Sequence, residues 1–258
     1  MKNLLAVLLF APLLFAQTRF DGTWEMKMDT LEFSGPPEVY VLREGMFHCV
    51  SCTPKIDVRT DGDRHNVTGQ PHFDTASIRI VDANVVEFAY WKDGTATFAC
   101  TETVSPDGKS MIEEFTETPD SERVTGHATF IRVANGPVNS HALSGSWEMR
   151  TVRNVSSTGP LTTYRITKDG MALSAGPEHF EAKFDGKEYP SHNDRQETNQ
   201  TVSLKLVDEN TIEETTKRDG KIVGGTLRRI SSDGKSMRVS YTDKEKGKTM
   251  TFTAEKQP

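Results

Sequence analysis

The residues best suited to chemistry in this sequence are three cysteines and the histidine beside one of them. His48, Cys49 and Cys52 lie together in the stretch REGMFHCVSCTP, and Cys100 is the third cysteine. Thiolates and imidazoles are ligands that zinc and copper prefer, so His48, Cys49 and Cys52 are the candidate metal ligands. A usual zinc site also needs a second pair of ligands at a fixed spacing, and the sequence offers none. We therefore predict no metal and no other cofactor.

The same cysteines are also candidates for a disulfide, which is the usual state of cysteines in a secreted protein. Cys49 and Cys52 form the most local pair and are the predicted disulfide, whereas a bridge from Cys100 to either of them is the alternative. A redox-active Cys-x-x-Cys motif normally lies between a strand and a helix. Val50 and Ser51 are instead expected between two strands.

Motifs for catalysis are missing from the sequence. It contains no Gly-x-Ser-x-Gly motif, no Walker loop and no His-Glu-x-x-His motif. Acidic pairs occur at Glu113–Glu114 and Glu213–Glu214, but neighbours on a strand point to opposite faces and cannot act together. We therefore predict no catalytic residue and a protein that is not an enzyme.

Ligand binding is better motivated, because one strand face differs between the two halves of the chain. Val86, Phe88 and Tyr90 alternate along a run in the first half, and Glu214 and Thr216 replace the two aromatic residues in the second half. If this face points inward, one half has an apolar, aromatic lining and the other a polar one. We take these five residues as candidate ligand-binding residues. The alternative is that they only fill a core.

The elements that must position these residues are short β-strands. Eight of the 19 glycines follow an aspartate, and Asp-Gly between alternating runs is a strong signal for a tight hairpin. Val202, Leu204 and Leu206 alternate with polar residues in one such run. Consecutive hairpins form an up-and-down antiparallel meander, and closure into a barrel removes its unpaired edges. The sequence therefore predicts an all-β fold with eight to ten strands in each half.

The two halves also match each other in order along the chain, which indicates a tandem repeat. The join at 134–142, ANGPVNSHA, has the composition of a linker. The predicted division is a barrel at 18–133, a linker at 134–142 and a second barrel at 143–258. The clearest matching pairs are Gly22–Met26 with Gly145–Met149, Ser77–Phe88 with Ser203–Glu214, and Ser105–Met111 with Ser231–Met237.

A Gly-x-Trp motif heads each half, as Gly22 with Trp24 and as Gly145 with Trp147. With a β-meander behind it, this motif resembles the lipocalin-like (calycin) families, and the whole chain resembles secreted bacterial proteins with two lipocalin-like units. The resemblance implies two tandem antiparallel barrels in which each tryptophan closes a barrel end. Core packing is the expected role of both tryptophans, and contact with a ligand is the alternative. The resemblance implies no particular activity.

The first residues predict export from the cytoplasm. Lys2 precedes the apolar run Leu4–Phe15, and the small residue Ala16 follows, which is typical of a signal peptide at 1–16. No other segment is apolar for long enough to span a membrane. The formal net charge of −6 and the lack of a basic cluster argue against nucleic acid as a partner. We therefore expect a periplasmic or secreted protein.

Three hypotheses for function follow from these observations. The leading one is a lipocalin-like protein that binds a small apolar or amphipathic molecule. The second is a structural or protein-interaction module with filled barrels, whose protein partner the sequence does not identify. The third is a metal-binding or redox-sensing protein that uses Cys49 and Cys52.

Overall fold

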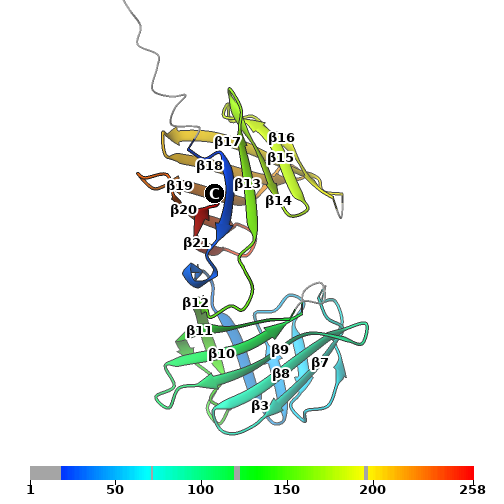
Figure 1. The fold of residues 1–258 in the computed structure, drawn as a ribbon. Helices are drawn as coiled ribbons and strands as arrows, with labels where there is room; N and C mark the ends of the chain where they lie inside the picture. The colour runs from blue at the N-terminus through cyan, green and yellow to red at the C-terminus, as the bar shows by residue number, and fades with distance from the viewer. Residues whose placement is uncertain (1–18, 71, 119–122, 195–196) are drawn as a thin grey trace, which may run out of the picture. The chain divides into compact units, whose positions relative to one another are not determined.

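The computed structural model describes residues 19–258 except 71, 119–122 and 195–196, so the predicted signal peptide lies outside the described residues (Figure 1). This part of the chain is almost entirely antiparallel β-structure, with one short 3-10 helix, η1 (Met28–Thr30), and it contains no helix long and apolar enough to cross a membrane. The strands are β1 (Gly22–Met26), β2 (Glu32–Ser34), β3 (Glu38–Arg43), β4 (Met46–Cys49), β5 (Ile56–Arg59), β6 (His65–Asn66), β7 (Thr75–Ile80), β8 (Val85–Lys92), β9 (Thr95–Val104), β10 (Ser110–Glu117), β11 (Val124–Asn135), β12 (Gly145–Arg153), β13 (Leu161–Ile166), β14 (Gly170–Ala175), β15 (Glu178–Lys183), β16 (Tyr189–Asn193), β17 (Gln200–Asp208), β18 (Thr211–Arg218), β19 (Lys221–Ile230), β20 (Ser236–Asp243) and β21 (Lys248–Lys256).

The chain forms two compact units. The barrel unit consists of Met28–Thr158 and Lys246–Thr251. The carboxy-terminal unit consists of the described residues 19–27 together with Gly159–Glu245 and Phe252–Pro258. Each unit has its own apolar core, one containing Trp147 and the other Trp24.

Ten strands of the barrel unit, β3 to β12, close into an antiparallel ring. Neighbouring strands pair in chain order from β3 to β5 and from β6 to β12. An isolated bridge between Asp61 and Arg79 joins the segment after β5 to β7. Pairing of β12 with β3, where Trp147 lies opposite Glu38, closes the ring. The predicted all-β architecture with an antiparallel barrel is therefore confirmed.

A two-residue turn sets the register of the hairpin between β8 and β9. Asp93 and Gly94 both have positive φ, at 49° and 80°, as a type I′ turn requires. Asp219 and Gly220, at 50° and 75°, make the equivalent turn between β18 and β19. Because side chains alternate along a strand, this register places Val86 and Phe88 inside the barrel and Glu87 outside.

One end of the barrel is closed by a buried tryptophan. The Trp147 side chain is fully buried, its Nε1 donates to the Leu143 carbonyl oxygen at 2.8 Å, and the Arg132 guanidinium lies 4.0 Å above its ring. At this closed end the inward side chains are fully or almost fully buried: Leu42, Val86, Val104, Met111 and Phe130. Toward the other end, inward side chains of the same strands keep part of their surface accessible: Tyr40, Tyr90, Phe98, Glu113 and Phe115. We call this the open end of the barrel unit.

The carboxy-terminal unit is an antiparallel sheet in which β13 to β20 pair in chain order. Strand β1 lies between β13 and β21, and the Lys256 backbone N–H donates to the Lys235 carbonyl oxygen just before β20. Trp24 is fully buried here, and its Nε1 donates to the Phe20 carbonyl oxygen at 2.9 Å. Lys256 Nζ lies 5.5 Å from the Trp24 ring. The arrangement around Trp147 is thus repeated around Trp24.

The observed units correct the predicted division of the chain. Strand β1 completes the carboxy-terminal unit, although the prediction assigned it to a barrel at 18–133. Strand β12 completes the barrel unit, although the prediction assigned it to 143–258. The predicted linker at 134–142 also belongs to the barrel unit, where the His141 N–H donates to the Leu42 carbonyl oxygen at 2.9 Å. The two Gly-x-Trp strands are alike, so the sequence pattern cannot distinguish which unit each one completes.

Candidate functional site

Two glutamates face each other inside the barrel unit. The hairpin between β9 and β10 pairs Glu102 directly with Glu113, and both side chains lie on the inward face. Cys100, two residues before Glu102, shares that face. The ligand atoms of these three side chains all lie within 4.8 Å of one another. The barrel interior thus contains a compact cluster of two carboxyls and one thiol, which we call the carboxyl cluster.

The surroundings of the carboxyl cluster favour the protonated acids. Burial, and then the nearby charges of Glu113 and Glu38, raise the pKa of Glu102 well above its usual range. Burial and the charge of Glu38 raise the pKa of Glu113 to about 7. Glu102 is only 4% exposed, and its Oε2 has no hydrogen-bond partner among the described residues. A buried carboxyl oxygen without a partner is costly, so an additional donor at this point would stabilise the site.

The thiol of Cys100 is reduced and buried. Burial raises its pKa, and the charges of Glu113 and Glu102 raise it further. The thiol therefore stays protonated and hydrogen-bonds with the Glu113 carboxyl group. An unreactive thiol in this position is a hydrogen-bond donor and a small apolar group.

Aromatic rings lie on the open-end side of the carboxyl cluster, since Phe98 follows Glu102 and Cys100 along the inward face of β9 toward that end. Phe73, Tyr90 and Phe98 form a stack, with ring centroids 4.4 Å and 5.6 Å apart. Tyr40 donates a short hydrogen bond from its hydroxyl to Glu38 Oε2, while Lys248 Nζ lies 3.0 Å from Glu38 Oε1. The open end therefore combines apolar rings with acids, and Glu38 already has a cationic partner.

The three candidate lining residues of the barrel unit occupy different depths. Val86 and Phe88 are buried in the core, where Phe88 packs edge-on against Phe47 at 5.3 Å. Tyr90 lies nearer the open end and keeps part of its surface accessible. Val86 pairs directly with Glu102 and Phe88 with Cys100, whereas Tyr90 pairs with Phe98, farther toward the open end. Burial of the Tyr90 hydroxyl, and then the nearby charges of Cys100 and Glu102, raise its pKa.

The candidate residues Glu214 and Thr216 lie inside the carboxy-terminal unit. Glu214 Oε2 forms a buried ion pair with Arg228 Nη1 at 2.9 Å. Arg228 Nε also donates to the Tyr164 hydroxyl at 3.1 Å, and Thr216 Oγ1 donates to Glu214 Oε1 at 3.4 Å. These polar groups therefore partner one another.

The predicted local disulfide is present, since Cys49 and Cys52 are joined in the structure. The third candidate of that group, His48, precedes Cys49 on β4 and points to the opposite face of the strand, where its Nδ1 is 2.5 Å from Asp57 Oδ1 on β5. Disulfide-bonded sulfurs offer no thiolate to a metal. The three candidate ligands His48, Cys49 and Cys52 are therefore not brought together as a metal site.

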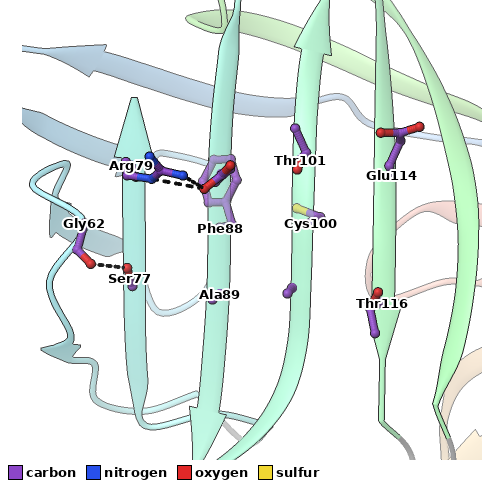
Figure 2. A pocket seen from close by; sticks show the side chains of 11 residues that line it. Gly62, Ser77, Arg79, Phe88, Ala89, Cys100, Thr101, Glu114 and Thr116 are labelled. Atoms are coloured by element: carbon purple, nitrogen blue, oxygen red, sulfur yellow. Dashed lines mark hydrogen bonds and ion pairs between the residues drawn. The ribbon is translucent and has the colours of Figure 1, made fainter. Parts of the chain in front are cut away.

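A separate groove of about 300 Å³ lies on the outer face of β7 to β10 (Figure 2). Small residues, Ala89 and the directly paired Ala99, leave space between the longer side chains. Ser77 Oγ donates to the Gly62 carbonyl oxygen, and Arg79 forms an ion pair with Glu87. Because its charged groups are already paired in this way, the groove has weaker grounds for ligand binding than the carboxyl cluster.

Sequence reasoning missed the pairing of Glu102 with Glu113. It considered only neighbouring acids, and Glu114 indeed points outward, 4.0 Å from His127. The signal that could have found the pair is the hairpin loop: Val104 pairs with Met111, so counting two residues outward in each strand brings Glu102 opposite Glu113.

No protein-family profile matches this chain, and no curated protein matches it.

Proposed function

We propose that the barrel unit binds a small amphipathic molecule at its open end, as an exported lipocalin-like protein would. The observation that carries this proposal is the gradient of accessibility along the barrel: Trp147 closes one end, while Tyr90 and Phe98 keep accessible surface at the other. Small barrels can hold a single ligand, and most such sites combine an apolar lining with a few polar groups. Here the polar groups are Glu102 and Glu113.

The test of this proposal is a titration of the purified protein with N-phenyl-1-naphthylamine, a neutral dye whose fluorescence rises in apolar surroundings. We expect saturable binding to the wild type. Tyr90→Ser removes the middle ring of the aromatic stack and should weaken binding about tenfold, or about 1.4 kcal/mol. Tyr241→Ser, at an exposed position of the carboxy-terminal unit, is the matched control. Equal affinities of the dye for all three proteins would show that it does not bind at the open end. That result would favour the alternative in which side chains fill the barrels.

We also propose that the two units arose by duplication and that the carboxy-terminal unit is a second lipocalin-like barrel. Support comes from matching details: the tryptophan hydrogen bonds to the carbonyls of Phe20 and Leu143, and the tight turns Asp93–Gly94 and Asp219–Gly220. The bulges that follow Tyr90 and Thr216 also fall at matching places in the strands.

Export is the third part of the proposal. The disulfide between Cys49 and Cys52 supports it, because disulfides persist in oxidising compartments. An intact mass spectrum of the protein recovered from its native host tests it. We expect the mass of a chain that starts after Ala16, lower by two hydrogens than the mass of the same chain in its reduced form. A full-length, fully reduced chain would contradict export.

A further inference from the structure

Resting on the proposed function, we propose that the molecule bound at the open end carries a protonated amine, which lies against Glu102 and Glu113.

Only acids act electrostatically on the carboxyl cluster from the described residues around it. The charges that shift the pKa of Glu102 are those of Glu113 and Glu38, and those that shift Glu113 are Glu38 and Glu117. Lys248, the cation beside Glu38, is paired with that acid. Glu102 Oε2 moreover finds no hydrogen-bond partner inside the barrel in the part of the chain that the structure describes. Among the described residues, the site therefore has no positive charge and Glu102 Oε2 has no donor, and an ammonium group supplies both.

The carboxy-terminal unit holds a cation of its own at the equivalent position. There Ile212 pairs with Arg228 across β18 and β19, as Val86 pairs with Glu102 across β8 and β9. Arg228 lies against both Glu214 and Tyr164, with its guanidinium carbon 5.6 Å from the tyrosine ring. That unit thus shows a cation between a glutamate and a tyrosine inside a β-sheet core. The barrel unit has acids and tyrosines at its open end, but Glu102 takes the place of the arginine.

An ammonium group suits this site better than a metal ion does. Cys100, Glu102 and Glu113 could together offer three ligand atoms, but metal binding would require the Cys100 thiolate. Burial and the two adjacent carboxyls raise the pKa of that thiol and so oppose its ionisation. An ammonium needs only carboxylate acceptors, and the stacked rings of Phe73, Tyr90 and Phe98 offer an apolar surface beside them. The apolar remainder of the ligand would pack on these rings.

The experiment is a competition at pH 7.5 in which decylamine, decanol or decanoate displaces N-phenyl-1-naphthylamine. The three competitors share a chain length and differ in charge. We expect decylamine to displace the dye at a concentration at least tenfold lower than decanol, and decanoate to be the weakest. Dye that binds but is displaced equally by the amine and the alcohol would overturn this inference and leave the proposed function standing. Absence of dye binding would instead contradict the proposed function, and with it this inference.

Substitutions test whether the preference for the amine over the alcohol comes from the carboxyl cluster. In the double variant Glu102→Gln with Glu113→Gln, the amine should lose its tenfold advantage while the dye still binds, which also shows that the variant is folded. Glu114→Gln, the outward neighbour, should behave like the wild type. A double variant that keeps the amine preference would overturn the inference. So would displacement of the dye by micromolar ZnCl₂ that Cys100→Ser abolishes, because that result would assign the site to a metal.

Discussion

At the scale of single residues, the pKa of Glu113 links the stability of the fold to pH. An acid whose pKa is raised in the folded protein binds more protons there than in the unfolded chain, so stability is greatest at low pH and falls as pH rises. For Glu113 the window runs from its usual value near 4.5 to about 7. Other titratable or charged groups face it or act on it, namely Glu38, Tyr40, Tyr90, Cys100, Glu102, Glu117 and, through Glu38, Lys248.

We predict that Glu113→Gln removes part of this pH dependence. Between pH 5 and pH 8 the wild type should lose about 2.5 kcal/mol of unfolding free energy relative to the variant, since one unit of pKa shift corresponds to about 1.4 kcal/mol and part of the shift falls below pH 5. Urea denaturation followed by tryptophan fluorescence at four pH values measures this difference. Glu114→Gln, exposed on the same strand, should follow the wild type. Parallel curves for the wild type and Glu113→Gln would show that the carboxyl is already ionised at pH 5.

At the scale of elements, the glycine of each Gly-x-Trp motif meets different surroundings. Gly145 has φ +143°, and a Cβ there would lie 2.5 Å from the Ala134 carbonyl oxygen and would also meet the Arg132 guanidinium that covers Trp147. Gly22 has φ +116°, but its Cβ would meet only the flexible end of Lys256 at 3.0 Å. The backbone around Gly145 cannot yield as a lysine side chain can.

We therefore predict that Gly145→Ala destabilises the protein by about 3 kcal/mol, through backbone strain and a steric clash. Gly22→Ala should cost about 1 kcal/mol, mainly from its positive φ. Thermal unfolding of the two variants compares them directly. Equal losses would mean that backbone conformation alone, and not the close approach of β11 to β12, explains the motif.

Hairpins were predictable from the sequence because their signals are local. The Asp-Gly pairs at Asp93 and Asp219 require positive φ, and alternation around them gave the inward face that contains Val86 and Phe88. The carboxyl cluster was not predicted because it depends on the register between two strands. Glu102 and Glu113 are eleven positions apart in the chain and become neighbours only through the exact length of their loop.

At the scale of the whole molecule, each unit depends on a tryptophan from the other half of the sequence. Trp24 is in the core of the carboxy-terminal unit, and Trp147 is in the core of the barrel unit. Which unit each strand completes was beyond the sequence, because a periodic pattern describes a strand and not its partners. A substitution of either tryptophan should therefore destabilise the unit formed mainly by the other half of the sequence.

We predict that Trp24→Ala destabilises the carboxy-terminal unit and that Trp147→Ala destabilises the barrel unit. Each substitution should lower the free energy of unfolding of that unit by about 3–5 kcal/mol. Hydrogen exchange followed by mass spectrometry locates the change. Peptides from β14 to β20 should exchange faster in Trp24→Ala, and peptides from β7 to β10 should exchange faster in Trp147→Ala. Faster exchange in β7 to β10 of the Trp24→Ala protein would contradict the strand assignment.

The place of β1 in the carboxy-terminal unit also has a consequence for the order in which the protein can fold during its synthesis. The ribosome makes β1 before any other described strand, yet its partners are β13 and β21, and β21 is the last described strand. The barrel unit closes as soon as β12 has been made, whereas Trp24 has no complete pocket until the final strand emerges. A nascent chain therefore carries an unpaired β1 throughout most of its synthesis.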